Sequence, residues 1–455
     1  MNLEQDTIAA VATAPGRGGI GVVRLSGPDA LAIGERIAER ALRPRHAHHA
    51  IFRAADGSAL DDGIVLAFPA PASFTGEHVV ELQGHGGSAV LDGVLQTCLA
   101  HGARLARPGE FSERAFLNGR VDLAQAEAIA DLVEAASAEA ARAALRSLQG
   151  VFSERVRALM DATTALRVWV EAAIDFPDED VDFIADGDVK GRIEAIEADL
   201  DTVLGEARRG ALLAEGMTVV LAGAPNAGKS SLLNALARRD AAIVTEVPGT
   251  TRDVLRERID LDGMPLHVID TAGLRLTDDL VEAEGVRRAR AEIERADALV
   301  YLVDGSASGT LPEDRAALLE RVGGTLPSRV LLVRNKIDLL DGETPHLDET
   351  GPLPSLSLSV RTGAGLDLLA RALQRLVGFE AGERSAFTAR TRHLAALGDA
   401  RRALREAATT LEDTGAGDLV AEDLRRAHEA LGRIVGEVTP DDLLGEIFGS
   451  FCIGK

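Results

Sequence analysis

Residues 218–231 read TVVLAGAPNAGKSS, and this stretch decides the fold of the middle of the chain. An apolar strand precedes Gly223-x-x-x-x-Gly228-Lys229-Ser230, and the helix-forming run SLLNALA follows, which is the context that a phosphate-binding P-loop requires. The glycines let backbone N–H groups curl around phosphate, and the start of the helix adds positive potential. Lys229 can reach the terminal phosphates, and the Ser230 hydroxyl can ligate Mg²⁺. The stretch predicts an α/β domain that binds a nucleoside triphosphate.

A second run indicates which base is bound. Asn335-Lys336-Ile337-Asp338 follows the apolar strand RVLLVR. The carboxylate of Asp338 can accept both hydrogens of the guanine N1 and N2 edge. Adenine presents no such pair of donors, so the run selects GTP over ATP.

Other segments suit the remaining parts of the nucleotide. The strand HVID ends at Asp270, an acid suited to the magnesium shell, and Gly273 of Thr271-Ala272-Gly273 can bring its N–H to a γ-phosphate. The loop PGTTRD, residues 248–253, would put a second hydroxyl on Mg²⁺. A backbone N–H of Ser359-Val360-Arg361 can contact the base. In this order, the motifs predict a guanine-nucleotide domain over about residues 216–378.

The group that orients the attacking water is less clear from the residues. Ras-like proteins carry a glutamine where this chain has Leu274, and leucine cannot orient water. Nearby acids that could replace it are Glu282, Glu284 and the pair Asp278-Asp279. The P-loop contains no arginine, so an external group or a cation must meet the charge of the transition state.

Composition bounds the class of protein. The chain has 455 residues, enough for about three domains, and 49 basic against 72 acidic side chains give a formal charge of −23, which opposes non-specific binding to nucleic acid. The Arg-rich run at residues 387–406 is the best local candidate for RNA contact, although such a run is often only a solvated helix face. No apolar run is long enough to span a membrane and the start lacks the features of a leader, so we expect a cytoplasmic protein with no membrane contact.

The pattern along the chain predicts a multidomain fold. Residues 1–118 mix strand-like runs with an apolar helix near 88–101 and indicate an α+β domain. Helical tracts at 119–215 and 379–455 flank the nucleotide domain, which suggests one discontinuous helical domain with a Ras-like P-loop domain inserted. The spacing of Leu145, Leu148, Phe152, Val156 and Leu159 predicts one helix there, and a break is expected near Phe176-Pro177-Asp178. A last helix, DDLLGEIF, should be capped at Thr439-Pro440 and end at Gly449, which would free the tail.

The cysteines fit a reducing compartment. Two cysteines make neither a disulfide framework nor a metal knuckle. Cys98 lies in the apolar run AVLDGVLQTCLA and is expected in the core, whereas Cys452 has no such cover. Lipidation of Cys452 is excluded because Ile-Gly-Lys does not fit a prenylation signal, which leaves a frayed end or a thiol held at a site.

The motifs GAPNAGKSS, PGTTRD, DTAGLR and NKID, placed between helical halves in a chain that ends in CIGK, resemble the MnmE or TrmE family of tRNA-modification GTPases. The N-terminal runs APGRGGIGVVRLSG, FTGEHVVELQGHGG and RPGEFSERAFLNGRVDLAQAEAIADL are also similar to that family, so the resemblance covers essentially the whole chain. It implies a homodimer that forms a heterotetramer with an FAD-dependent partner, MnmG. Together they would install an aminomethyl or carboxymethylaminomethyl group on carbon 5 of the wobble uridine of certain tRNAs. The carbon would come from a tetrahydrofolate, in the 5-formyl or 5,10-methylene form.

The resemblance also implies roles for individual residues. Residues 1–118 would dimerise and bind folate through Arg24, Glu81, Arg120 and Lys455. Without the family, Arg24 and Glu81 would be taken for a surface ion pair. Potassium would be held by Asn226, Thr245, Val247 and Thr250, Mg²⁺ by Ser230 and Thr251, and Glu282 would act through water. The GTP-binding residues are then Asn226, Ala227, Gly228, Lys229, Ser230, Ser231, Thr245, Glu246, Val247, Pro248, Gly249, Thr250, Thr251, Asp270, Thr271, Ala272, Gly273, Asn335, Lys336, Ile337, Asp338, Ser359, Val360 and Arg361.

Two positions depart from the family pattern. Val360 replaces the usual alanine and is expected to loosen the guanine loop slightly, and Phe74 replaces the usual tyrosine before Thr75-Gly76, which removes one hydroxyl on the folate side. A basic neighbour such as Lys455 or Arg24 could lower the pKa of Cys452 and favour its thiolate, which suggests a catalytic role. The rival function is a switch, for example a ribosome-assembly GTPase, that performs no folate chemistry.

Overall fold

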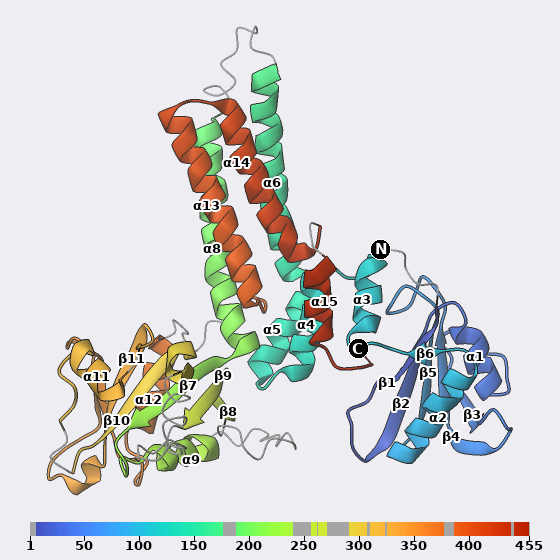
Figure 1. The fold of residues 1–455 in the computed structure, drawn as a ribbon, viewed down its shortest axis with the longest axis horizontal. Coiled ribbons are helices and arrows are strands. Elements are labelled where there is room, and N and C mark those ends of the chain that lie inside the picture. Colours follow the sequence, from blue (N-terminus) through green and yellow to red (C-terminus); the bar gives the residue numbers. More distant parts are fainter. Residues whose placement is uncertain are drawn as a thin grey trace. The chain divides into compact units, whose positions relative to one another are not determined.

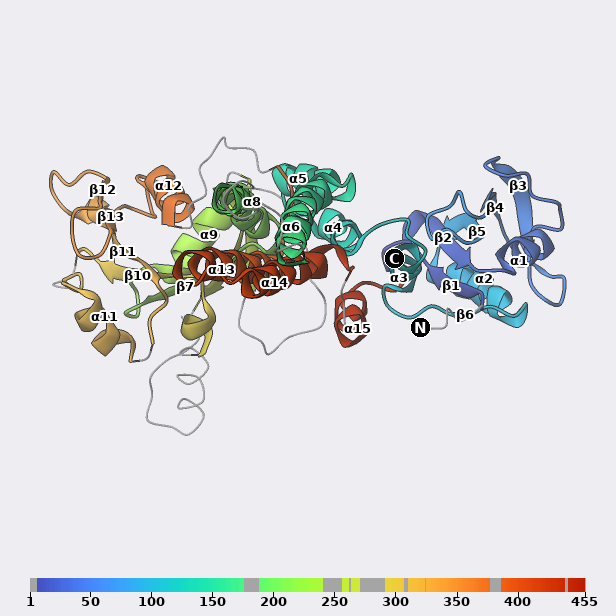
Figure 2. The same cartoon turned by 90° about the horizontal axis from the view of Figure 1, so that it is seen from above.

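The computed structural model describes residues 6–175, 188–239, 256–261, 263–270, 291–306, 310–323, 325–376, 386–437 and 441–454. The chain forms two compact units. The first is Met1–Ala130 with Val156–Thr164 and Arg425–Lys455, and the second is Asp131–Arg155 with Ala165–Leu424. Figure 1 and Figure 2 label their elements. Within the described ranges, no helix combines the length and apolar character that crossing a membrane requires.

The first unit contains a six-stranded sheet in the order β3-β4-β5-β2-β1-β6. Its pairs are antiparallel except β1 with β6. The run IGVVRL was predicted as a strand and lies within β2, and of the predicted run EHVVEL the last four residues, from Val79, lie in β5. The strands are β1 (Ile8–Val11), β2 (Gly18–Ser26), β3 (His48–Arg53), β4 (Ala59–Phe68), β5 (Val79–Gly86) and β6 (Arg104–Leu105).

Two helices, α1 (Ala30–Ile37) and α2 (Ser88–Ala100), contact each other and pack on this sheet. Their apolar residues and the inward side chains of the strands form one buried cluster, with Phe52 and Leu82 at 1 % exposure or less. Cys98 is fully buried there, as predicted, and burial raises the pKa of its thiol to about 12. The apolar helix near 88–101 is confirmed as α2, whereas α1 was not predicted.

The second unit contains a seven-stranded sheet in the order β12-β13-β11-β10-β7-β9-β8. Neighbouring strands are parallel except at the two edges, where β8 and β12 run antiparallel to their partners. The strands are β7 (Met217–Gly223), β8 (Arg256–Leu261), β9 (Met264–Asp270), β10 (Ala298–Asp304), β11 (Arg329–Asn335), β12 (His346–Asp348) and β13 (Ser355–Ser357).

Alternate residues of the central strands bury opposite faces of this sheet. Leu221 and Val300 belong to one apolar cluster, and their neighbours Val220 and Leu299 belong to the other. Helices α9 (Lys229–Arg239) and α12 (Leu366–Leu376) cover the first face, and α11 (Arg315–Val322) covers the second. The predicted multidomain fold, with an N-terminal α+β part, helical segments and a Ras-like α/β part, is confirmed.

Long helices flank this sheet in the chain. They are α4 (Leu123–Glu134), α5 (Ala138–Leu148), α6 (Val151–Asp175), α8 (Val189–Glu215), α13 (Thr391–Asp413) and α14 (Gly417–Val435). Helix α13 packs along α8, and α8 runs directly into β7 through Gly216, whose φ is +73°. Helix α6 is described as far as Asp175, and the break expected at residues 176–178 lies outside the described residues.

The prediction of one helix across residues 145–159 is wrong. Helix α5 ends at Leu148, and α6 begins at Val151 after Gly150, whose φ of +96° does not belong to a right-handed helix. Leu145 is 45 % exposed, because α5 buries a different face, formed by Ala140, Ala143, Ala144 and Ser147. The three-and-four spacing of apolar residues therefore continues across Gly150 only by coincidence.

The last helix, α15 (Asp441–Gly449), ends at the predicted glycine. Its cap residues 439–440 lie outside the described residues. The expectation that the tail is freed after Gly449 is wrong, because Phe451 is 5 % exposed and packs in an apolar cluster with Phe448 and Leu123. An aromatic side chain at this position gains more from burial than the short tail loses by being ordered.

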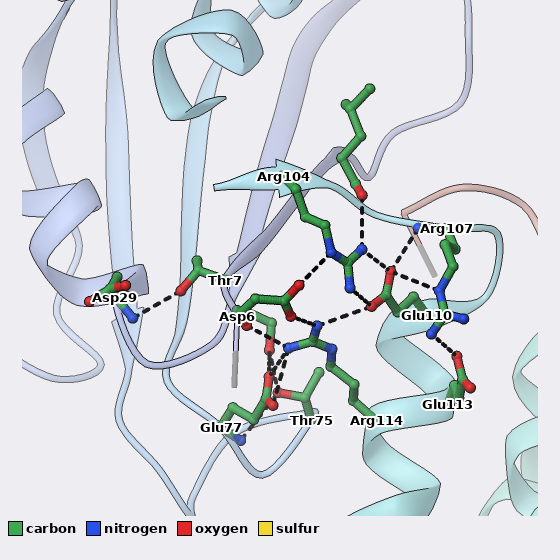
Figure 3. A network of polar contacts seen from close by, with 12 residues as sticks. Asp6, Thr7, Asp29, Thr75, Glu77, Arg104, Arg107, Glu110, Glu113 and Arg114 are labelled. Atoms are coloured by element: carbon green, nitrogen blue, oxygen red, sulfur yellow. Dashed lines mark hydrogen bonds and ion pairs between the residues drawn. The ribbon is translucent and has the colours of Figure 1, made fainter. Parts of the chain in front are cut away.

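Short helix α3 (Glu110–Leu117) is anchored by a buried ion cluster (Figure 3). Glu110 is 1 % exposed and accepts from Arg104 at 2.6 and 2.8 Å and from Arg114 at 3.0 Å. Asp6 accepts from the same two arginines, at 2.5 and 2.6 Å. Burial raises the pKa of Glu110, but the hydrogen bonds from Arg104, the Arg107 N–H and Arg114 outweigh it and lower the pKa to about 2.

We expect this cluster to make the first unit sensitive to acid. The folded-state pKa of Glu110, about 2, lies below its ordinary value of 4.5, so the ionised carboxylate contributes stability above about pH 4.5 that is lost as the pH falls towards 2. The contribution is at most on the order of 3 kcal/mol. Glu110→Gln should therefore reduce the amide hydrogen-exchange protection of α3 at neutral pH, and the difference from wild type should shrink as the pH falls from about 5 to about 3.

Glu113→Gln is the matched control. Glu113 lies in the same helix, but burial raises its pKa, so removing its charge should not reduce protection. The role assigned to Glu110 is wrong if its variant and the wild type differ by the same amount at every pH.

Candidate functional site

The loops that carry the predicted nucleotide motifs meet at one edge of the seven-stranded sheet. The P-loop follows β7, Asn335–Asp338 follows β11 and Ser359–Arg361 comes shortly after β13, and these strands run in the same direction. Ligands of parallel α/β sheets bind at the carboxyl ends of the strands. The topology therefore places the predicted motifs where a ligand can contact them together.

A cavity of about 520 Å³ lies at this edge. It is lined by the P-loop end, by α9 and by both base-recognition loops, through Gly228, Ser231, Asn234, Ala235, Asn335, Lys336, Asp338, Leu339, Val360 and Arg361. The sequence predicted the loop residues but missed Asn234, Ala235 and Leu339. The first two lie in α9 one turn beyond the P-loop motif, and helical spacing from Ser231 is the signal that would have found Ala235.

The side chain of Asn335 holds the loops together. Its Nδ2 donates to the Ala227 carbonyl of the P-loop at 2.9 Å, and its Oδ1 accepts from the Val360 N–H at 3.0 Å. The same oxygen accepts from the Lys336 N–H at 2.8 Å. Asn335 is 3 % exposed, so these bonds compensate for the burial of its amide.

Asp338 is set up as an ionised acceptor. It accepts from the Ser359 hydroxyl at 2.5 Å and pairs with Arg361 at 2.7 Å. The hydrogen bond from Ser359, together with Arg361, lowers the pKa of Asp338. A carboxylate that stays ionised suits the two N–H donors of a guanine edge.

Lys336 is held by an acid that the sequence analysis missed. Its Nζ lies 2.5 Å from Oδ2 of Asp304, at the end of β10, and Oδ1 of Asp304 accepts from the Ser306 N–H at 3.0 Å and its hydroxyl at 2.6 Å. The hydrogen bonds from Lys336 and Ser306 lower the pKa of Asp304 to about 2. Asp304 stands opposite Asn335 in the parallel register, and an acid at the end of an apolar strand is the signal that would have found it.

The P-loop has the backbone that its glycines allow. Gly228 has a φ of +101°, and a Cβ there would lie 2.2 Å from Nδ2 of Asn335. Asn226 has a φ of +63°, a left-handed conformation that asparagine tolerates better than most residues. Lys229 is buried, and its Nζ donates to the carbonyls of Gly223 at 2.7 Å and Ala224 at 2.9 Å.

Several predicted residues lie outside the described residues: Thr245, Glu246, Val247, Pro248, Gly249, Thr250, Thr251, Thr271, Ala272, Gly273, Glu282 and Lys455. The other acids considered for the water-positioning role, Glu284 and Asp278-Asp279, lie there too. Asp270 ends β9. In the described part of the chain, His, Cys, Asp and Glu side chains form no cluster of three that could hold a metal ion. The exposed hydroxyl of Ser230 is a hard oxygen donor that fits Mg²⁺.

The first unit carries a second polar site. Arg24 and Glu81 face each other on β2 and β5, and the guanidinium donates to Oε1 of Glu81 at 2.9 and 3.1 Å. The Arg24 guanidinium carbon also lies 5.7 Å from the ring centre of Phe74 and 5.8 Å from that of Phe111. The pair is partly exposed, at 25 % for Arg24 and 18 % for Glu81, so a ligand in solution can reach it.

The tail that carries Cys452 is seated on the same unit. The Gly109 N–H donates to the Cys452 carbonyl at 3.4 Å, and Gly454 is buried so closely that a Cβ would lie 2.3 Å from the carbonyl oxygen of Val11. The thiol itself is exposed. This packing at the ends of β1 and α3 excludes a frayed tail.

Two family models match this chain. A model described as the MnmE helical domain matches residues 123–452, and one described as the GTP-binding protein TrmE N-terminus matches residues 7–120. Three relatives carry the name tRNA modification GTPase MnmE. The protein of Chromohalobacter salexigens is 58 % identical over 99 % of this chain and 98 % of its own length. That of Stutzerimonas stutzeri is 58 % identical over 99 % of both chains, and that of Pseudomonas entomophila is 57 % identical over 100 % of both.

This chain belongs to the MnmE family of tRNA-modification GTPases. The resemblance inferred from its motifs is thereby confirmed over the full length.

The Arg-rich run of this MnmE-family chain is occupied by contacts with its own acids. Arg390 donates to Asp131 at 2.6 Å, Arg401 lies 3.2 Å from Asp201, and Arg405 lies 3.5 Å from Glu197. Contacts of this kind favour the solvated helix face over an RNA-binding surface.

The Gly228 backbone provides a test of the nucleotide site. Gly228→Ala should lower the affinity for a fluorescent GTP analogue by about ten- to a hundredfold, because a Cβ would collide with Nδ2 of Asn335 and break a buried hydrogen bond. Equilibrium fluorescence titration measures this. The control is Gly205→Ala in helix α8, where the added methyl meets open space, and which should leave affinity unchanged and raise stability by about 0.5–1 kcal/mol. If Gly228→Ala bound the GTP analogue as tightly as Gly205→Ala, the assignment of this cavity to the nucleotide would be wrong.

Proposed function

We propose that this chain is the GTP-hydrolysing component of the system that installs an aminomethyl or carboxymethylaminomethyl group on carbon 5 of wobble uridine in certain tRNAs. The carbon comes from a tetrahydrofolate, and an FAD-dependent MnmG-type protein is the partner in a heterotetramer. The observation that carries the proposal is that one chain combines a guanine-type cavity with a separate, partly exposed Arg24–Glu81 site. A nucleotide switch alone needs only the cavity.

The nucleotide site supports GTP hydrolysis through distinct roles of its residues. Asp338 and the Val360 loop take the guanine, Lys336 lies beside the base, and Lys229 reaches the phosphates once nucleotide displaces it from the P-loop carbonyls. Ser230 and Thr251 would hold Mg²⁺, which neutralises phosphate charge when bound. Glu282 is proposed to orient the attacking water, because Leu274 cannot.

A potassium ion is proposed to replace the missing arginine of the P-loop. Asn226 and the residues Thr245, Val247 and Thr250 would hold it by oxygen atoms, where it supplies positive charge to the transition state. The exposure of Asn226 supports this, since an ion in solution can reach its side chain. The nucleotide domains of two copies in the homodimer would approach each other when GTP and potassium are bound.

The Arg24–Glu81 site is proposed to take the folate. The arginine side chains of Arg24 and Arg120, with Lys455, suit the glutamate tail of a folate, and the Glu81 carboxylate suits the amino edge of the pterin. The exposed thiol of Cys452 is proposed to act at the same site, because its tail is seated against β1, which pairs with β2, and against the start of α3. The rival function, a switch without folate chemistry, predicts that none of these residues matters for tRNA.

Nucleoside mass spectrometry of tRNA from cells tests this function. Where the only copy of the protein carries Arg24→Met or Cys452→Ser, the wobble modification should be lost, while GTP hydrolysis by the purified variants stays intact. The controls are Arg53→Met, which breaks the pair between Arg53 on β3 of the same sheet and Glu39, and Ile453→Ala, the exposed neighbour of Cys452. Full modification with Arg24→Met would favour the switch, and full modification with Cys452→Ser alone would remove only the thiol from the proposal.

Potassium should accelerate GTP hydrolysis relative to sodium by about tenfold or more, because removing one charge-stabilising group typically costs that much. Asn226→Gly should abolish the difference, since glycine adopts the φ of +63° at no cost and removes only the side-chain ligand. The measurement is the initial rate of phosphate release in each salt at equal ionic strength. Equal wild-type rates in both salts would rule out the potassium site.

A further inference from the structure

The loop Ser73–Glu77 contacts two of the arginines assigned to the folate. The Phe74 ring centre lies 5.7 Å from the Arg24 guanidinium carbon. A Cβ on Gly76 would lie 3.3 Å from Cγ of Arg120, so the Arg120 stem lies beside the loop and leaves little space for a side chain at position 76. The position of this one loop therefore affects both side chains.

Side-chain hydrogen bonds hold the loop in place. Among the described residues, the backbone-to-backbone hydrogen bonds outside helices and strands do not involve residues 73–77. Instead, the hydroxyls of Ser26 and Thr75, both fully buried, lie 2.7 Å apart, and Ser26 also donates to Oε2 of Glu77 at 2.7 Å. The Ser73 hydroxyl donates to the Glu77 carbonyl at 2.5 Å.

Arg114 ties this loop to helix α3 (Figure 3). It is 5 % exposed, and Nη1 donates to both carboxylate oxygens of Glu77, at 3.1 and 3.2 Å. Nη2 donates to Asp6 at 2.6 Å and to Glu110 at 3.0 Å. The rigid fork of a buried guanidinium thus fixes the Glu77 carboxylate relative to α3.

Helix α3 also contributes directly to the Arg24 surroundings. Phe111, in its first turn, lies on the Arg24 guanidinium, and the Asn118 amide just after its end donates to the Thr75 carbonyl at 2.8 Å. The Arg120 N–H donates to the Ala115 carbonyl of the same helix at 2.8 Å. The loop and the helix therefore both lie next to Arg24 and Arg120, and Arg114–Glu77 is the ion pair that joins them.

We propose that Glu77 and Arg114 are positioning residues for the folate site: their ion pair fixes the Ser73–Glu77 loop, which places Phe74 on Arg24 and Gly76 against Arg120. This inference rests on the proposed folate function and deepens it. Neither residue needs to touch the ligand, since Arg114 is buried and acts through Glu77 and Thr75. A purely structural ion pair would affect stability and binding together, whereas a positioning pair affects binding while the fold survives.

The test is calorimetric titration of the full-length protein with 5-formyl-tetrahydrofolate. Glu77→Gln removes the charge that Arg114 holds and leaves Arg114 its bonds to Asp6 and Glu110, so the unit should stay folded. Thr75→Val removes the hydroxyl that is bonded to Ser26 and accepts from the Glu77 N–H, and it keeps the side-chain volume. Both variants should bind about tenfold more weakly, as expected when a hydrogen bond that positions a binding group is lost.

Matched variants separate positioning from a structural effect. Thr75→Ser restores the hydroxyl and should recover wild-type affinity within about twofold, and Glu39→Gln, which breaks the Arg53 pair on the same sheet, should bind as wild type. The change in melting temperature should be too small to account for the loss of affinity, and GTP hydrolysis should be unchanged in all variants. The losses from Glu77→Gln and Phe74→Leu should not add, because Glu77 acts through the placement of Phe74.

The outcomes distinguish this inference from the function beneath it. If the wild type binds and Arg24→Met does not, while Glu77→Gln and Thr75→Val bind as wild type, the positioning role is wrong and the folate site stands. If affinity falls only in step with melting temperature, or Thr75→Ser fails to restore it, the positioning role is also wrong. If the wild type shows no binding, the folate function and this inference fail together.

Discussion

The nucleotide site depends on one buried amide. Asn335 bonds to the P-loop carbonyl of Ala227 and to the N–H of Val360, which come from loops more than a hundred positions apart in the chain. Leaving a buried polar group without its partner costs more free energy than the hydrogen bond itself contributes. Any other arrangement of these loops would therefore be destabilised. The close approach also explains why only glycine fits at position 228, where the amide occupies the space of a side chain. The P-loop and the two base-recognition loops are thereby held in one arrangement.

The same sheet is bound to the helical part of the second unit. Ala140 and Ala143 of α5 lie in the same apolar cluster as Leu266 and Val300 of the sheet. The Ser137 hydroxyl, which caps α5, donates to the Gly263 carbonyl in the turn between β8 and β9 at 2.9 Å. This hairpin begins just after residues 248–253 and ends at Asp270, just before Thr271-Ala272-Gly273. Segments that the sequence assigns to the phosphates and Mg²⁺ thus flank, along the chain, a hairpin whose turn is bonded to helix α5.

In the first unit, a cluster of ion pairs surrounds helix α3. The excess of acids in the chain predicts a negative surface, but Asp6, Glu77 and Glu110 are engaged by Arg104 and Arg114 around α3. Taking such groups out of water is costly unless each charge keeps a partner, and these arginines and acids provide several partners for one another. The cluster fixes helix α3, and both the Ser73–Glu77 loop and the Cys452 tail contact this helix or its first residues.

In the second unit, the structure accommodates the valine at position 360, where the family usually has alanine. The Val360 side chain packs on the apolar cluster of the sheet, and its N–H donates to Asn335.

The sequence by itself determined the features that depend on local spacing: the P-loop between a strand and a helix, the NKID run after an apolar strand, the burial of Cys98 and the end of α15 at Gly449. A phosphate cradle and a helical or strand period are properties of neighbouring residues, so they can be inferred from a short stretch. Local spacing failed at Gly150, where a positive φ divides what the apolar period joined. Only the tertiary structure decided that Asn335 links three loops, that Asp304 holds Lys336, that Arg114 holds Glu77 and that the tail is seated at Gly109. These contacts depend on which strands and helices become neighbours. The free energy that selects those neighbours comes from the packing of the whole core, so no single stretch of the sequence determines it.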